Sequence, residues 1–278
     1  MDLGNVTVVL HRPSSAENIG AVARAMKNFG LARLAIVAPP SWTGLPRGGG
    51  PRTAREEVLL RARKTARRAA DVLESAAIHD DARAALALTT WTCGTTSRAI
   101  EGRPRLLPRE LAREVASRAT KGPVAIMFGE ERRGLSDREL ELCQAVCTIP
   151  TRAAYDSMNL AQAVAVVAYE LACVELSSTP GEPERAPGPE AGCGPERATS
   201  MGGHEAPPPR MSEPARHATV EALWTRLAAL LDAAGYLNPQ NPEHILADWR
   251  RLLARAEPTQ REVELLLAAA RSLERKLR

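Results

Sequence analysis

The sequence predicts an α/β protein with a parallel sheet, joined through a linker to a small all-helical unit. Short apolar runs alternate with segments of helical periodicity over residues 1–176, the pattern of strand–helix–strand units with parallel strands. Residues 177–216 are rich in Pro, Gly and Glu and poor in large apolar side chains, as in disordered linkers. Residues 217–278 show helical periodicity alone. We therefore expect an α/β domain, a disordered linker and a helical C-terminal extension with these boundaries.

Five short apolar runs are expected to form the sheet. Each holds several apolar residues in succession, as strands buried on both faces do. Because helical segments separate them, the strands are expected to run parallel. The runs cover residues 6–10, 34–37, 84–90, 121–128 and 146–149.

The helices between these strands carry recognisable start signals. Ser14 and Glu17 are spaced as a capping box for the first helix, and Ser136 and Glu139 for a later one. Residues 160–176 are apolar on nearly every side, which is typical of a helix packed inside a protein. A densely basic segment, residues 52–68, is also expected to be helical; it is either a solvated face or a surface that suits a phosphate backbone.

The C-terminal extension is expected to hold three amphipathic helices. The first ends near Gly235, the second has Pro242 in its first turn, and Thr259 and Glu262 form a capping box for the third. A core of some 60 residues is marginal alone. We therefore expect this unit to dock on the rest of the chain or to dimerise.

Composition bounds the class of protein. Hydrophobic residues make up 44% and charged residues 25%, and the net charge of +4 is compatible with a nucleic-acid partner. No apolar run is expected to reach the ~18 residues of a membrane span, and the N-terminus lacks the pattern of a signal peptide. We expect a cytoplasmic protein without membrane contact. Five scattered cysteines, with no second ligand pair beside Cys143 and Cys147, predict no metal site.

Polar loops follow four of the expected strands. Ligands of parallel sheets generally lie beyond the carboxyl ends of the strands, so these loops favour one shared site. Two side chains also have simpler interpretations: Ser157 as a helix N-cap, and Arg24 as a solvated arginine on an amphipathic helix. The loops are residues 14–18, 89–94, 129–134 and 155–159.

Three segments, in this order, resemble the three motifs of the SpoU branch of SPOUT RNA methyltransferases. They are residues 18–30 (NIGAVARAMKNFG), 128–136 (FGEERRGLS) and 149–160 (IPTRAAYDSMNL). The arrangement and the helical tail, with the sequence NPQNP at 238–242, are most similar to the TrmJ-type tRNA 2'-O-methyltransferases. The resemblance implies a deep trefoil knot and S-adenosylmethionine as methyl donor, with S-adenosylhomocysteine as product. A homodimer is also expected, with the helical C-terminal extension in contact with the second copy or with RNA.

The resemblance also implies roles for individual residues. Arg24, with Asn18, Ser157 and Asn159, is expected to face the target ribose, and Glu130 belongs to the same catalytic set. The cofactor is expected to contact the other residues of the motifs, with Thr89, Thr90 and Trp91 on its adenosine side. The cofactor-binding set is Thr89, Thr90, Trp91, Gly129, Ile149, Ser157, Met158 and Leu160. One departure is that the family usually has a small residue and then arginine after the threonines, where this chain has Trp91-Thr92.

The implied activity is methylation of a ribose 2'-hydroxyl in the anticodon loop of tRNA, at position 32. Since an arginine side chain gives up its proton only under strongly basic conditions, Arg24 is expected to clamp a substrate phosphate and support the developing alkoxide rather than act as a base. The aromatic content of 3% favours recognition of RNA by phosphates and shape over base stacking. Two alternatives stay open: a ribosomal-RNA methyltransferase of the same branch, and a non-catalytic RNA-binding protein on the same scaffold. A Rossmann-type methyltransferase is disfavoured, because no G-x-G follows the first strand.

Overall fold

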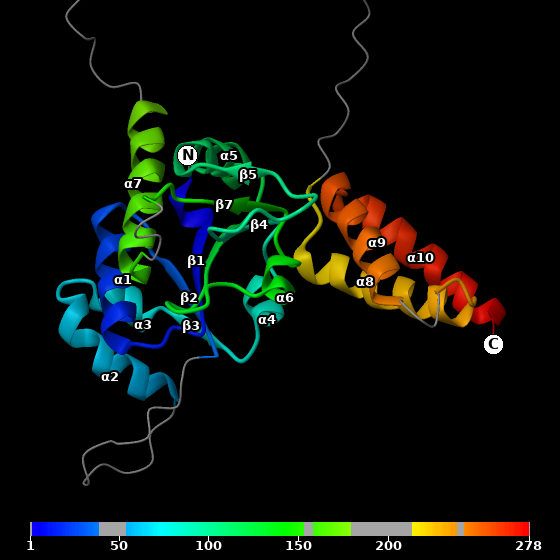
Figure 1. Ribbon diagram of the computed structural model, residues 1–278, viewed down its shortest axis with the longest axis horizontal. Helices are drawn as coiled ribbons and strands as arrows, with labels where there is room; N and C mark the ends of the chain where they lie inside the picture. The colour runs from blue at the N-terminus through cyan, green and yellow to red at the C-terminus, as the bar shows by residue number, and fades with distance from the viewer. Residues whose placement is uncertain (1, 39–53, 153–157, 179–212, 238–241, 278) are drawn as a thin grey trace, which may run out of the picture.

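The computed structural model describes residues 2–38, 54–152, 158–178, 213–237 and 242–277. Within them, one sheet has the strand order β3-β2-β1-β6-β4-β7-β5, and every neighbouring pair is parallel. The expected α/β fold with a parallel sheet and a helical tail is therefore confirmed (Figure 1). The strands are β1 (Val6–His11), β2 (Arg33–Val37), β3 (Ala77–His79), β4 (Trp91–Thr95), β5 (Arg105–Leu106), β6 (Val124–Phe128) and β7 (Ala145–Cys147).

Helices cover both faces of the sheet. The helices α1, α2, α3, α5 and α7 share one core cluster with the sheet, and α4 and α6 share a second cluster on the opposite face. A short 3-10 helix, η1 (Leu3–Asn5), precedes β1. The helices of this domain are α1 (Ala16–Asn28), α2 (Ala54–Ala66), α3 (Ala70–Glu74), α4 (Ala82–Leu86), α5 (Pro108–Ala119), α6 (Asp137–Leu140) and α7 (Leu160–Ser178).

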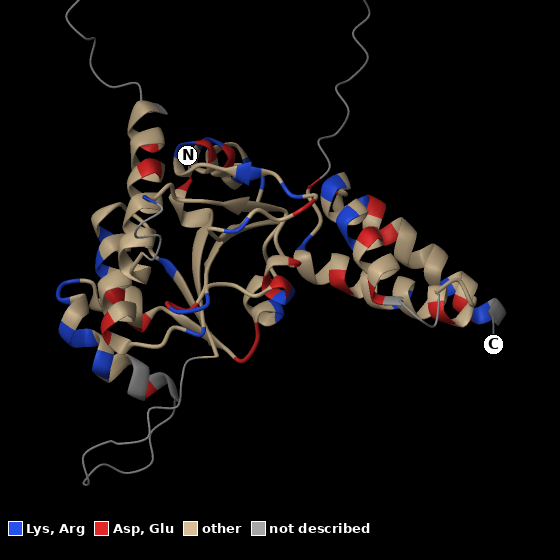
Figure 2. Cartoon of the chain, viewed as in Figure 1, with Lys and Arg blue, Asp and Glu red and all other residues tan. Residues whose placement is uncertain are grey.

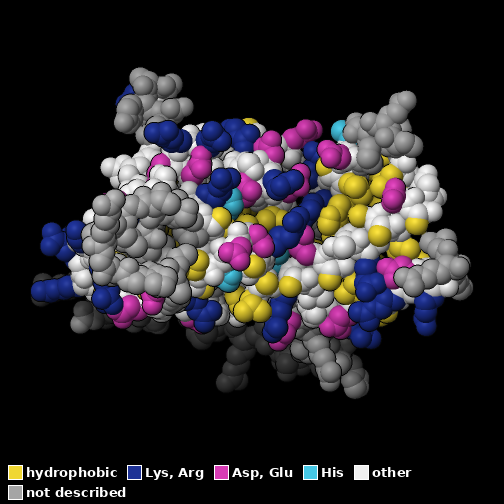
Figure 3. Space-filling view, turned by 90° about the horizontal axis from the view of Figure 1, so that it is seen from below, with side chains coloured by type: hydrophobic (Ala, Val, Ile, Leu, Met, Phe, Trp, Pro, Cys, Tyr) yellow, Lys and Arg dark blue, Asp and Glu magenta, His cyan; other side chains and the backbone are white. Residues whose placement is uncertain are grey.

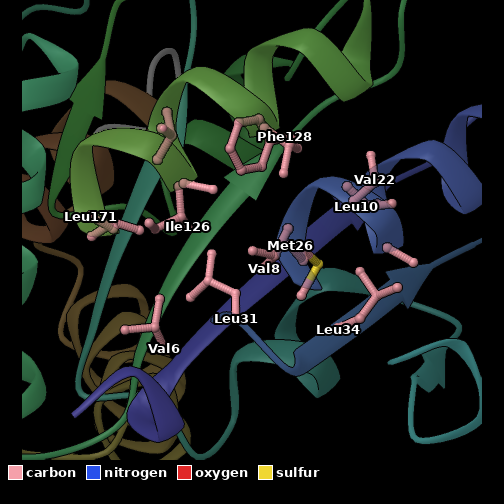
Figure 4. Packing of buried hydrophobic residues seen from close by; sticks show 14 of the residues in the cluster. Val6, Val8, Leu10, Val22, Met26, Leu31, Leu34, Ile126, Phe128 and Leu171 are labelled. Carbon is pink, nitrogen blue, oxygen red and sulfur yellow. The ribbon is translucent and has the colours of Figure 1, made fainter. Parts of the chain in front are cut away.

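The core follows from the alternation of side chains along the strands. Val8 and Leu10 of β1 belong to the cluster under α1 and α7, whereas Val9 between them belongs to the cluster under α4 and α6. Figure 4 shows Val8 beside Met26 of α1, and the same face of the sheet continues to Phe128 of β6. All of these side chains are almost fully buried. The sheet is thus a rigid support for the loops at its carboxyl edge.

The strand expected at residues 84–90 was wrong. Asp81 caps a helix here, accepting a hydrogen bond of 2.9 Å from the amide of Ala84, and α4 then runs to Leu86. The strand begins at Trp91, which pairs with Val124 at the start of β6. Alanine and leucine suit a short capped helix as well as a buried strand, so the apolar run alone placed the start of the strand at residue 84 and not at Trp91. The sequence reasoning also missed β3, β5, α3 and α5.

The C-terminal unit consists of three helices, as expected. They are α8 (His217–Ala233), α9 (Pro242–Ala256) and α10 (Gln260–Leu277). The hydroxyl of Thr259 donates to the carboxylate of Glu262 at 2.8 Å and accepts from its amide at 3.3 Å, which confirms the third capping box. Leu223, Val263 and Leu267 form a small core of their own.

This unit docks on the α/β domain, which confirms one of the two expected outcomes for so small a core. The amide of His217 donates to the carbonyl of Thr89 at 2.7 Å. The guanidinium of Arg118 donates to both carboxylate oxygens of Glu257, at 2.8 and 2.9 Å. The contact joins the amino-terminal end of β4 to α8 and α9 (Figure 1). The two expected domains are therefore in direct contact.

The linker expected at residues 177–216 falls mostly outside the described residues, which omit 179–212. Its two ends differ from the expectation. The helix α7 continues through Ser178, and the amide of Ala215 donates to the carbonyl of Pro258 at 3.1 Å, so residues 213–216 pack with the C-terminal unit. The domain boundaries stay a prediction.

The helix α7 overturns the expectation that no apolar run reaches membrane-spanning length. Residues 160–177 are long and apolar enough, with a mean hydropathy of 1.5, and they are the one such helix among the described residues. A helix buried in a core passes the same test. Val164, Val167 and Leu171 on its inner face are buried in the cluster shared with α1 and α5. One face of α7 therefore packs in the core of the α/β domain.

The resemblance implies a trefoil knot, which depends on the path of the whole chain, including the segment between β7 and α7. That segment includes residues 153–157, which lie outside the described residues. The knot therefore stays a prediction.

Candidate active site

A carboxylate, that of Glu131, is the centre of the polar network at the carboxyl edge of the sheet. It lies in the loop after β6. One of its oxygens accepts hydrogen bonds from the amide and the hydroxyl of Ser14, at 3.0 and 2.6 Å. The other oxygen accepts from the side-chain amide of Asn18 at 2.6 Å. Glu131 thus joins the loop after β6 to the start of α1.

Asn18 extends this network to the third motif. Its carbonyl oxygen accepts from the side-chain amide of Asn159 at 3.0 Å. The carbonyl oxygen of Asn159 in turn accepts from the backbone amide of Ala161 at 2.9 Å, which caps the first turn of α7. Because Glu131 can only accept from Asn18, the order of donors fixes the orientation of both amide side chains. Two of the expected site residues, Asn18 and Asn159, are therefore in direct contact, 141 positions apart in the sequence.

The cap of α1 differs in detail from the expected capping box. Ser15 is the N-cap, and its hydroxyl accepts from the amide of Asn18 at 3.2 Å and donates to Glu17 at 2.8 Å. Ser14, expected to be the cap, bonds to Glu131 instead. One serine therefore begins the helix and its neighbour ties that helix end to the site.

The surroundings of Glu131 favour its ionised form. Partial burial raises the pKa of this carboxyl, but the hydrogen bonds from Ser14 and Asn18 outweigh that effect, and the pKa lies below its ordinary value of 4.5. The network therefore contains a carboxylate at neutral pH.

A pocket of about 300 Å³ lies beside this network. It is formed where β4, β6 and β7 end, together with the first turn of α7. We call it the donor pocket. Its lining residues are Thr95, Thr96, Ser97, Arg98, Phe128, Gly129, Glu130, Glu131, Arg132, Arg133, Gly134, Cys147, Ile149, Thr151, Met158, Leu160 and Ala163.

Four residues of the expected cofactor set line this pocket: Gly129, Ile149, Met158 and Leu160. Gly129 has a steric reason to be glycine. A Cβ atom there would lie 2.1 Å from the carbonyl carbon of Gly134, because the loop folds back on itself. Ser157, which was also expected to contact the cofactor, lies outside the described residues.

Thr89, Thr90 and Trp91 are not at the donor pocket, so their expected role needs correction. They lie at the amino-terminal end of β4, whereas the pocket is at its carboxyl end. Trp91 is buried under the guanidinium of Arg118, whose central carbon is 4.9 Å from the ring centre, beside the docked C-terminal unit. The error follows directly from placing this strand too early.

The residues that occupy the expected place are 95–98. Their sequence, Thr95-Thr96-Ser97-Arg98, consists of threonines followed by a small residue and an arginine. The family to which the sequence was compared usually has this arrangement, whereas Trp91 and Thr92 follow Thr89 and Thr90 with neither a small residue nor an arginine. The signal was therefore present in the sequence, one strand length further along the chain.

Glu130 does not join the network, although it lines the pocket. Its backbone carbonyl accepts from the amide of Gly134 at 2.9 Å, and its carboxylate lies 3.8 Å from the guanidinium of Arg133. The expected catalytic role of Glu130 therefore stays a prediction. Glu131, which sequence reasoning passed over, has the contacts, and only the structure distinguishes the two adjacent glutamates.

Arg24 lies on the exposed side of α1, six residues beyond Asn18. This separation is about 9 Å along a helix axis. Arg24 does not line the donor pocket, and it forms no ion pair with any residue that the structure describes. An exposed guanidinium near the site is free to meet a substrate anion, and its proposed role is considered below.

The chain matches two family models. The SpoU rRNA Methylase family matches residues 5–169, and the model described as tRNA methyltransferase TrmJ, C-terminal domain, matches residues 218–278. The chain is similar to the tRNA (cytidine/uridine-2'-O-)-methyltransferase TrmJ of Cronobacter sakazakii, with 33% identity over 276 residues, covering 98% of this chain and 97% of that protein.

Two solved structures support the comparison. TrmJ from Z. mobilis ZM4 superposes with a TM-score of 0.72 at 28% identity, covering 96% of this chain and 98% of its own. A probable methyltransferase from Bordetella pertussis Tohama I is 35% identical with a TM-score of 0.52, covering 61% of this chain and 95% of its own.

The fold and the site define a methyltransferase of the SpoU class. The chain belongs to the SpoU methylase family and, within it, to the TrmJ group. The chain is therefore an S-adenosylmethionine-dependent enzyme, and the expectation of a SpoU-branch methyltransferase is confirmed.

Proposed function

We propose that this enzyme methylates a ribose 2'-hydroxyl in the anticodon loop of tRNA, with position 32 as the expected target. The observation that carries the proposal is the network of Glu131, Asn18 and Asn159 at the edge of the donor pocket. Support for tRNA comes from the relatives named tRNA (cytidine/uridine-2'-O-)-methyltransferase, which match over nearly their full length. We place the enzyme in the cytoplasm, where tRNA is processed.

The residues of the donor pocket fit S-adenosylmethionine. The pocket has a volume of about 300 Å³, at the lower end of the range for small-molecule sites. Apolar side chains line part of it, those of Ile149, Met158 and Leu160. At Gly129, which has no room for a side chain, the backbone itself lines the pocket. We assign its adenosine side to residues 95–98 in place of Thr89, Thr90 and Trp91. When bound, S-adenosylmethionine supplies an electrophilic methyl group.

The protein's part in the reaction is to position the ribose and stabilise charge. The network holds Asn18 and Asn159 in one orientation, so that their remaining polar groups are fixed before RNA arrives. Arg24 meets the RNA backbone phosphate and supports the developing negative charge of the 2'-oxygen, because a guanidinium offers a positive charge and several hydrogen-bond donors. The hydroxyl proton leaves directly or through water.

The enzyme is also proposed to act as a homodimer. The helix α7 is strongly apolar, yet only 28% of residues 160–177 are buried. Tyr169 and Leu176 on this helix are 53% and 74% exposed. A second copy packed against α7 would remove this apolar surface from water.

The substrate assay tests the proposed function. Purified enzyme and methyl-labelled S-adenosylmethionine are incubated with bulk tRNA in one reaction and with ribosomal RNA in another. Nuclease digestion then locates the label. We expect label on a 2'-oxygen of the tRNA anticodon loop. Label confined to ribosomal RNA would transfer the enzyme to that substrate class, and cofactor binding without any label would favour the non-catalytic alternative.

A further inference from the structure

Three hollows on the surface are connected through shared side chains. Arg98 lines the donor pocket and also a cavity of about 320 Å³ between residues 98–103, α6 and α9. Arg103 and Arg251 line that cavity and a further one of about 380 Å³, which continues along α9. The donor pocket and these two cavities therefore adjoin one another, in a row that reaches the C-terminal unit.

The two cavities form a groove that is lined by five arginines and four carboxylates. We call it the arginine groove; it is lined by Arg98, Arg103, Arg250, Arg251 and Arg255. Four carboxylates line the same cavities: Glu101, Asp137, Glu141 and Glu257. Figure 2 marks Lys and Arg positions in blue on segments between the α/β domain and the helical tail. Figure 3 shows Lys and Arg side chains, interspersed with Asp and Glu, in the middle of one face of the molecule.

Two of these arginines have no carboxylate partner. Arg98 pairs with Asp137 at 2.9 Å, and Arg251 pairs with Asp248. Arg103 and Arg255, by contrast, form no ion pair with any residue that the structure describes. A guanidinium carries five donors in a planar fork, which suits a phosphate as well as a carboxylate.

Arg103 is the more informative of the two. It is half-buried, and its guanidinium donates to the backbone carbonyl of Glu141 at 3.1 Å. Burial lowers the pKa of Arg103, although nearby Cys143 and Glu141 oppose this shift. A partly buried cation held by a neutral carbonyl leaves most of its donors for an anion.

The backbone shapes the groove for the arginine of α9. Gly102 has a φ of +72°, and a Cβ atom there would lie 3.1 Å from the Cδ atom of Arg251. The same short segment, residues 98–103, therefore touches the donor pocket at one end and α9 at the other. Residues of both domains therefore form the groove.

We propose that the arginine groove binds the phosphate backbone of the substrate RNA and guides it from the C-terminal unit to the donor pocket. This inference rests on the proposed function, because it assumes that the substrate is RNA. Contacts of this kind position the nucleic acid without reading its sequence.

The test compares two double variants of the C-terminal unit. Arg251→Gln with Arg255→Gln removes two charges from the groove. Arg271→Gln with Arg275→Gln removes two exposed charges from α10, outside the groove, and is the matched control. Binding of bulk tRNA is measured at several salt concentrations, together with calorimetric binding of S-adenosylmethionine.

We expect the groove variant to bind tRNA roughly tenfold more weakly and with a salt slope shallower by about two, because about one counterion is released per phosphate contact. Binding of S-adenosylmethionine should not change. Equal tRNA binding by the groove variant and the wild type, or an equal loss in the control variant, would overturn the proposal. Failure of the proposed function would appear separately, as wild-type enzyme that transfers no methyl group to tRNA.

Discussion

At the scale of single residues, the site depends on which side chains hold others in place. Glu131 has no expected contact with the methyl group, yet it accepts hydrogen bonds from both Ser14 and Asn18. Its removal would leave these donors in a partly buried site without an acceptor, which is costly. Glu131 is therefore a positioning residue, and Arg24 is the residue proposed to touch the substrate.

Replacement of Arg24 tests that proposed role. Arg24→Ala should lower kcat for tRNA methylation by about 10²–10³-fold, because it removes a donor aimed at developing negative charge. Arg24→Lys should recover part of the rate only, since an ammonium keeps the charge but not the planar fork.

Lys27→Ala, on the next turn of α1, is the control, because Lys27 pairs with Asp71 away from the site. Steady-state kinetics with tRNA measure all three variants. A near-wild-type rate for Arg24→Lys would count against the clamp.

The stability of the network should depend on pH in one direction. The folded pKa of Glu131 lies below its ordinary value of 4.5. The stabilisation from its ionised form is therefore fully present above about pH 4.5, and it is lost as the pH falls through the folded pKa.

Chemical denaturation from pH 7 to 3 measures this effect. The difference in unfolding free energy between the wild type and Glu131→Gln should shrink below about pH 4.5, because glutamine does not ionise. The same difference at every pH would contradict the assignment of the shift to Glu131.

At the scale of elements, the sheet places three loops so that they meet. Three of the loops expected at one site each follow a strand. They are residues 14–18 at the start of α1, residues 129–134 after β6, and residues 155–159 before α7. The contact between Asn18 and Asn159 confirms this expectation. The sequence could predict it because strand order and direction in a parallel sheet bring carboxyl ends together.

The misplaced strand shows where such reasoning fails. Residues 84–90 are apolar and could form either a strand or a helix; what decides is the cap at Asp81, the start of β4 and its pairing with β6. Pairing between β4 and β6 joins positions some 33 residues apart, which a local pattern does not contain. The short strands β3 and β5, of three and two residues, were missed for the same reason.

The turn after β6 gives a prediction at this scale. In Gly129→Ala the new methyl group would lie 2.1 Å from the carbonyl carbon of Gly134, so the loop must move. Overpacking of this kind costs about 1–3 kcal/mol, and affinity for S-adenosylmethionine should fall by about tenfold or more. Titration calorimetry and thermal unfolding measure the two effects.

Gly235→Ala is the control for this variant. Gly235 has a φ of +67° and nothing within 4 Å of an added Cβ, and it lies at the end of α8. Its replacement should lower stability by about 1 kcal/mol through backbone strain and leave cofactor affinity unchanged. Equal loss of cofactor affinity in the two variants would contradict a local effect at the pocket.

At the scale of the whole molecule, two surfaces of the α/β domain are assigned to different partners. One is covered by the C-terminal unit, which docks through Arg118 and Glu257 and through the amide of His217. The other is the exposed apolar side of α7, which we propose a second copy covers. The sequence predicted the apolar character of α7 but not how little of it one chain buries.

The proposed dimer predicts the effect of a charge on α7. Leu176→Asp should weaken dimerisation by about 30-fold or more, since an unpaired charge buried in an interface costs about 2 kcal/mol or more. Leu273→Asp, on α10, is the control, because this leucine is also exposed, at 55%. Sedimentation at several protein concentrations measures both, and unchanged association of Leu176→Asp would rule out this face.

The central claim is that the network around Glu131 organises the site for methyl transfer to tRNA. The most direct measurement is the rate of label transfer from S-adenosylmethionine to tRNA by Glu131→Gln and by its neighbour Glu130→Gln, with cofactor binding measured for each. Glutamine at 131 has one acceptor oxygen for three donors, so we expect kcat to fall by roughly 10²-fold while Glu130→Gln stays within a few-fold of the wild type. The reverse order, with Glu130→Gln inactive and Glu131→Gln active, would contradict this account of the site.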